Sequence, residues 1–87
     1  MSETQTWIIA WFRQRGGTDQ FDDRTLAALN YFTAGLIDSM GVVELIAVIE
    51  EHFRFTFDHA HFQDRRFATI AGLSAIVDEI RGTSGRR

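Results

Sequence analysis

An aspartate and a serine at the start of the most apolar segment are the residues of this sequence best placed for chemistry. Asp38 and Ser39 follow a loop-like stretch that contains Gly35, and an apolar, helix-like segment begins directly after them. A serine that opens a helix is normally a cap, whose hydroxyl accepts a hydrogen bond from a free backbone N–H of the first turn. An exposed hydroxyl there is also a favourable attachment point for a phosphodiester, because the free N–H groups and the positive end of the helix dipole favour an anion.

The string GLIDSMGVVELI, residues 35–46, resembles the modification motif of acyl carrier proteins and their aminoacyl and peptidyl carrier relatives. The similarity continues through residues 50–57 and 67–70, so it covers roughly the last three-fifths of the chain. In that family the serine of an Asp-Ser-Leu or Asp-Ser-Met triplet carries 4′-phosphopantetheine. The resemblance therefore implies that Ser39 is the attachment residue and that coenzyme A supplies the group. It also implies that Asp38 helps to present the site to a magnesium-dependent phosphopantetheinyl transferase.

The resemblance also implies a function. The chain is expected to be a free-standing carrier that tethers an acyl or aminoacyl thioester on the phosphopantetheine arm, and not an enzyme. It would deliver the thioester to partner enzymes of a biosynthetic pathway. Besides the transferase, the implied partners are an acyl- or aminoacyl-loading adenylating ligase and downstream enzymes that use the acyl group. The Asp-Ser-Met-Gly string at residues 38–41 and the aromatic junction at residues 67–69 look similar to stand-alone carriers that receive activated amino or carboxylic acids, including the D-alanyl carrier proteins. Gly41 and Arg54 replace an acid and a glycine that are common in fatty-acid carriers, which weakens a fatty-acid assignment.

One side of the helix predicted after Ser39 is expected to contact these partners. Met40 and Val43 are apolar but lie at the edge of the core stripe, where they are either partly buried or a small exposed contact beside Ser39. Acidic residues on a helix are usually a solvated face, but beside Ser39 they would steer basic surfaces toward the attachment site. The candidate partner-binding residues are Met40, Val43, Glu44, Ala47, Glu50 and Glu51.

The sequence offers little for catalysis or metal binding. A hydrolase nucleophile elbow needs glycine two residues before and two after the serine, and Ile37 occupies the first of these positions. His52, His59 and His61 are the only candidates for a general base, and nothing in the sequence brings one next to Ser39. The His-x-His pair has no acid or cysteine at ligand spacing, so no metal site is predicted. The alternative function is a helical protein-interaction module without a prosthetic group, which would not need Ser39.

Composition limits the class of protein. The chain has 87 residues, enough for one small domain, and 45% of them are hydrophobic, which argues against disorder. No long apolar run or basic leader indicates a membrane span or signal segment, so a cytoplasmic monomer is expected. Residues 36–64 contain six acids against one base, which argues against nucleic acid as a partner. The chain has no cysteine, so the sulfur of any thioester would have to belong to a prosthetic group.

Capping signals and apolar spacing predict three main helices. The expected ranges are 3–15, 39–54 and 70–81, with Ser2 and Thr69 as N-terminal caps and with Gly16 and Gly82 at the ends of the first and last helix. Glycine suits these ends because it readily adopts the left-handed conformation that terminates helices.

The connections are predicted to be less regular. Residues 18–34 form a long first loop, in which Asp22 and Asp23 can cap a short helix while Tyr31 and Phe32 attach the loop to the core. Residues 55–57 are expected to be an extended loop that buries two aromatic rings.

The predicted fold is all-α, a small four-helix bundle in which three main helices are joined by one short helix and the long first loop. The short helix is expected over residues 62–67, with Phe62 and Phe67 both turned inward. A single carrier domain is predicted over residues 1–82, followed by a disordered tail over residues 83–87.

Overall fold

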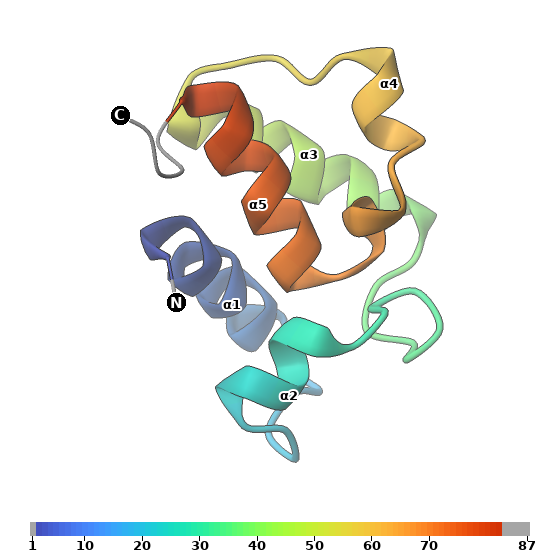
Figure 1. Ribbon diagram of the computed structural model, residues 1–87. Helices are drawn as coiled ribbons and strands as arrows, with labels where there is room; N and C mark the ends of the chain where they lie inside the picture. Colours follow the sequence, from blue (N-terminus) through green and yellow to red (C-terminus); the bar gives the residue numbers. More distant parts are fainter. Residues whose placement is uncertain (1, 83–87) are drawn as a thin grey trace.

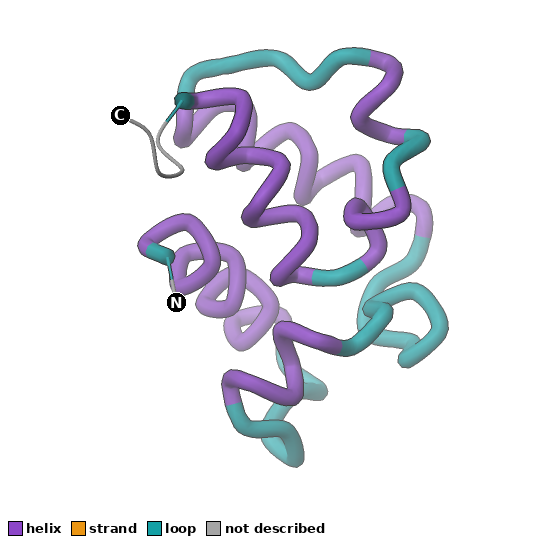
Figure 2. The backbone as a smooth tube through the Cα atoms, in the orientation of Figure 1, coloured by secondary structure: helices purple, strands orange, loops and turns teal. Residues whose placement is uncertain are grey.

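The computed structural model describes residues 2–82, and over that range the chain is all-α, which confirms the predicted small helical bundle (Figures 1 and 2). The tail predicted over residues 83–87 lies outside the described residues. Three helices are long and the others are short. In chain order they are α1 (Glu3–Arg15), α2 (Asp23–Ala28), α3 (Ser39–Phe53), α4 (His59–Phe62), the 3-10 helix η1 (Arg65–Ala68) and α5 (Ile70–Arg81).

Local capping sets most of these boundaries. The Ser2 hydroxyl accepts a hydrogen bond from the Gln5 N–H at 3.0 Å and begins α1 as predicted. Asp22 caps α2 in the same way, at 2.8 Å from the Thr25 nitrogen, and Thr69 caps α5. At the end of α5, Gly82 has a φ of 70°, which is the left-handed conformation expected of a glycine at that position.

The core lies around α5, which passes between the other helices in Figure 1, with α1 and α2 below it and α3 and α4 above. Ile70, Leu73, Ile76 and Val77 give α5 an almost fully buried apolar face. Buried residues of the other segments pack around this face. They are Ile8, Ile9, Phe12, Leu26, Ala27, Tyr31, Ile37, Leu45, Ile49, Phe57 and Phe67. On α3, Leu45 and Ile49 are fully buried, whereas Val42, Ile46 and Phe53 are half-buried.

The long first loop is attached to the segment before α5. Tyr31 is buried, its N–H donates to the carbonyl oxygen of Ala68 at 3.1 Å, and its hydroxyl donates to the carbonyl oxygen of Phe67. Burial raises the pKa of the Tyr31 hydroxyl above its usual value. Phe32 was predicted to attach the loop to the core together with Tyr31, but its side chain is 43% exposed. Its ring contacts the buried Tyr31 ring, with ring centres 5.0 Å apart, and stays exposed to solvent.

The prediction of one helix over residues 62–67 is also wrong. Helix α4 ends at Phe62, and the Asp64 carboxylate accepts a hydrogen bond from the Arg66 N–H at 2.9 Å, which starts η1 as a separate turn. Phe67 is buried as expected, but Phe62 is 43% exposed because it belongs to the first of the two pieces. In the extended loop before α4, Phe57 is buried and Phe55 is half-buried.

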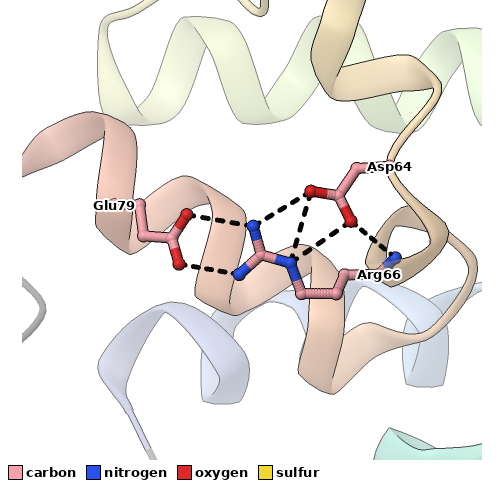
Figure 3. Close-up of polar contacts among 3 residues, drawn as sticks. All are labelled: Asp64, Arg66 and Glu79. Atoms are coloured by element: carbon pink, nitrogen blue, oxygen red, sulfur yellow. Dashed lines mark hydrogen bonds and ion pairs between the residues drawn. The ribbon is translucent and has the colours of Figure 1, made fainter.

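A close backbone contact joins η1 to α5. A Cβ atom at Gly72 would lie 2.1 Å from the carbonyl oxygen of Arg66, so no other residue fits there without a shift of the backbone. The Arg66 guanidinium also bridges Asp64 and Glu79 across the same junction (Figure 3), with ion-pair distances of 3.0 and 2.7 Å. The segment between α3 and α5 is therefore fixed to α5 by both backbone and charge.

Candidate functional site

Ser39 is the first residue of α3, and the structure corrects the expectation that it caps the helix. Asp38 is the cap, with its Oδ1 accepting a hydrogen bond from the Gly41 N–H at 2.8 Å. Ser39 is exposed, and its hydroxyl has no hydrogen-bond partner among residues 2–82. Because Asp38 performs the capping, the Ser39 hydroxyl is free to react without loss of a bond that holds the helix.

Close packing explains the glycine two residues after the serine. Gly41 is buried, and a Cβ atom there would lie 2.6 Å from Cγ1 of Ile37 and 3.0 Å from a guanidinium nitrogen of Arg15. An acidic side chain at this position would displace both neighbours. The first turn of α3 therefore lies close to the end of α1, and Ile37 fills the space beneath it.

The apolar residues next to Ser39 are exposed, which favours the contact interpretation over the core interpretation. Met40 is 72% exposed and Val43 is 61% exposed, and these are the two most exposed large apolar residues in the described part of the chain. Helical spacing places Ala47 and the acidic residues near them on the same side of α3. We call this surface the α3 outer face, formed by Met40, Val43, Glu44, Ala47 and Glu51, all of which are exposed.

Two acidic residues predicted to contact partners already have neighbours within the chain. The Glu44 carboxylate forms an ion pair with Arg15 at 2.9 Å, and it stays 63% exposed. Glu50 is half-buried, and its Oε2 accepts a hydrogen bond from the Phe57 N–H at 2.9 Å, so it supports the loop after α3. Glu50 therefore lies outside the α3 outer face, while Glu44 belongs to it as part of an exposed pair.

Arg15 is a residue of the site that sequence reasoning missed. Its guanidinium lies 4.9 Å from the centre of the Trp11 ring, pairs with Glu44 and approaches Gly41. The ion pair joins residues 29 positions apart in the chain, so no local spacing could reveal it. The only signal was a basic residue in the last turn of a predicted helix, where it also complements the helix dipole.

The three histidines do not lie near the serine. His52 stacks on Trp7, with ring centres 4.5 Å apart, close to the other end of α3 and about 20 Å along the helix axis from Ser39. His61 accepts a hydrogen bond from the Asp58 N–H at 2.8 Å, and His59 contacts Gln63. Within residues 2–82, no group of three or more histidine, aspartate or glutamate side chains could hold a metal ion.

A hollow lined largely by apolar side chains lies beside α3, and sequence reasoning did not find it. It has a volume of about 400 Å³ and lies between α3, the first loop and the segment from α4 to η1. It was missed because Phe32 was expected to attach the first loop to the core and Phe62 to turn inward, whereas both line the hollow and are exposed. The lining residues are Phe32, Val42, Ile46, Phe62, Asp64, Arg65, Phe67 and Ala68.

Comparison with known proteins gives no assignment. No protein-family model matches the chain, and no solved structure matches it significantly. None of the helices in the part of the chain that the structure describes has both the length and the apolar character needed to cross a membrane.

Proposed function

We propose that this chain is a carrier protein that bears 4′-phosphopantetheine on Ser39 and presents a thioester to partner enzymes. The observation that carries the proposal is the exposed Ser39 hydroxyl at the first position of a long helix, directly after a cap made by Asp38. The resemblance of residues 35–46 to the carrier motif supports it. When bound, the phosphopantetheine group supplies the thiol that the chain itself lacks.

The residues at the start of α3 fit a phosphodiester. An α-helix leaves its first backbone N–H groups without intrahelical acceptors. The backbone N–H groups of Ser39 and Met40 also have no other hydrogen-bond acceptor among the described residues. These donors and the positive end of the helix dipole stabilise an anion attached at Ser39. In this proposal Asp38 holds the helix start, and the side chain of Ser39 stays outside the hydrogen-bonding of the fold.

The α3 outer face is the proposed docking surface. Met40 and Val43 give it two exposed apolar contacts, and Glu44 and Glu51 give it negative charge that attracts basic partner surfaces. A surface with two apolar contacts makes only a small interface, and a small interface forms and releases quickly, which a shuttling carrier needs. The proposed partners are a phosphopantetheinyl transferase, a loading ligase and enzymes that use the acyl group, with the carrier acting as a cytoplasmic monomer.

The proposal gives the chain no catalytic step of its own. The imidazole of His52 lies at the far end of α3, and the α4 histidines make local contacts, so none is positioned to activate Ser39. Proton removal from the serine hydroxyl is therefore assigned to the transferase.

A helical interaction module without a prosthetic group is the second candidate. The exposure of Met40 and Val43 favours it as well, because any partner-binding helix would show such residues. The two functions differ in one respect, since only the carrier needs the Ser39 hydroxyl.

Intact-mass measurement separates the two. The purified chain is incubated with coenzyme A, magnesium and a broad-specificity phosphopantetheinyl transferase, alongside Ser39→Ala and Ser2→Ala. The carrier proposal expects the mass of one phosphopantetheine to be added to the wild type and to Ser2→Ala, and nothing to be added to Ser39→Ala. No gain in a wild-type chain shown by circular dichroism to be folded would overturn it and leave the interaction module.

A further inference from the structure

Two of the sequence predictions that failed concern the same place. Phe32 was expected to attach the first loop to the core and Phe62, 30 residues later, to turn inward. Each is instead 43% exposed on the hollow beside α3. Phe67 forms part of its buried wall, and Val42 and Ile46 line it from α3. Its volume of about 400 Å³ lies within the range of small-molecule sites, about 300–1,000 Å³. Water in contact with these walls is displaced favourably by an apolar group.

The negative charge that lines the hollow is already compensated. Asp64 accepts hydrogen bonds from the Arg66 N–H and from the Arg66 guanidinium, which also donates a hydrogen bond to Glu79 (Figure 3). These bonds to Arg66 lower the pKa of the Asp64 and Glu79 carboxyl groups, so both stay ionised and paired near neutral pH. Asp64 therefore contributes little free negative charge to the hollow.

The positive charge that lines the hollow is not compensated. Arg65 is exposed, and among residues 2–82 its guanidinium has neither an ion-pair partner nor a hydrogen-bond partner. Arg65 and Arg66 are adjacent, but of the two only the Arg66 side chain forms ion pairs within the described residues. The hollow thus combines aromatic and aliphatic walls with one unpaired guanidinium, a group suited to bidentate contact with a carboxylate.

We propose that this hollow binds a small free carboxylic acid with an aromatic or aliphatic body, the body lying against Phe32 and Phe62 and the carboxylate on Arg65. This site is separate from the carrier proposal, because the acid binds without any group attached to Ser39. Its chemistry selects against neutral compounds of the same shape and against cations.

A titration of the unmodified chain tests the site. Phenylbutyrate and the neutral alcohol phenylbutanol are added separately to isotope-labelled protein, and backbone amide NMR shifts report where and how tightly each binds. The comparison is made for the wild type, Arg65→Gln and Arg24→Gln. Arg24→Gln removes the same charge from an exposed position on α2, away from the hollow.

The expected result is a set of shifts around Phe32, Ile46, Phe62 and Phe67 with both compounds, and tighter binding of the acid. Arg65→Gln should weaken acid binding about fivefold at low salt and leave alcohol binding unchanged, while Arg24→Gln should change neither. The proposal fails if no shifts appear at the hollow, if acid and alcohol bind equally well to the wild type, or if the two arginine variants behave alike. None of these outcomes depends on whether Ser39 is modified.

Discussion

The two ends of α3 are built in opposite ways. At the Ser39 end, the side chains of Met40 and Val43 project into solvent, and the ion pair between Arg15 and Glu44 is exposed. At the Phe53 end, aromatic and cationic groups from other helices close over the helix. Trp7 contacts both His52 and Phe53, and the Arg81 guanidinium lies 4.8 Å from the centre of the Phe53 ring.

This difference separates the part of the helix that holds the fold from the part that is available to other molecules. Large apolar residues at an exposed helix start contribute little to stability, because their surface is not removed from water on folding. The aromatic group at the other end buries surface and joins α1, α3 and α5. Substitutions at the Ser39 end should therefore change modification or docking more than stability, and those at the Phe53 end should do the reverse.

The largest expected effect is that of Ser39→Ala at the open end. It should abolish the addition of phosphopantetheine completely while lowering the free energy of unfolding by less than about 0.5 kcal/mol, since Asp38 and not Ser39 caps the helix. Intact mass and urea unfolding measure the two quantities. A loss of stability much above this value would mean that Ser39 has a structural role that the contacts do not show.

Phe53→Ala tests the closed end. Removing a half-buried ring that packs on Trp7 and Arg81 should lower the free energy of unfolding by about 2 kcal/mol. The rate of modification at Ser39, measured at a temperature where the variant remains folded, should stay at the wild-type value. A slowed modification would show that the two ends of α3 are coupled.

Met40→Ser and Val43→Ser sharpen the comparison at the open end. Each should lower kcat/KM for modification by the transferase by up to about tenfold, because an apolar anchor at the centre of a small interface contributes more than the residues around it. Thermal unfolding should change little in either variant. Unchanged transferase kinetics in both would remove the α3 outer face from the proposed docking surface.

The smallest of these expected effects is that of Asp38→Ala, which acts on the stability of the fold. Loss of the cap should cost about 1 kcal/mol in the free energy of unfolding, and Asp38→Asn should recover most of it because the amide oxygen still accepts the Gly41 N–H. Asp22→Ala, which removes the cap of α2, provides the matched control. If Asp38→Ala and wild type unfold alike, the capping bond contributes nothing in solution.

Local signals in the sequence predicted most of the fold. Ser2, Thr69 and Gly82 act on backbone groups within a few residues of themselves, so their effects could be read directly from spacing. The spacing of apolar residues likewise predicted the helix over residues 70–81, where the structure has α5. The position of Ser39 at a helix start was also predicted, although the capping role belongs to the residue before it.

The features that were missed depend on contacts between distant segments. The exposure of Phe32 and Phe62 follows from how the first loop and the α4–η1 segment meet α3, and residue type alone predicted the opposite. The pairing of Arg15 with Glu44 required two helices to be placed side by side. Helical spacing could not decide whether Met40 and Val43 were core or surface, since residues at the edge of a stripe depend on what packs beside them.

The buried hydroxyl of Tyr31 gives the molecule an internal optical reporter. It is the only tyrosine in the chain, so the ultraviolet absorbance of phenolate has a single source. Because burial raises the pKa of this hydroxyl above its usual value of 10.0, the stabilising effect of the buried, protonated form is present below pH 10 and is lost as the pH rises further. Alkaline titration should therefore show ionisation of Tyr31 together with separation of the first loop from η1. The ultraviolet absorbance of Tyr31 then measures whether the contact between the first loop and η1 is intact.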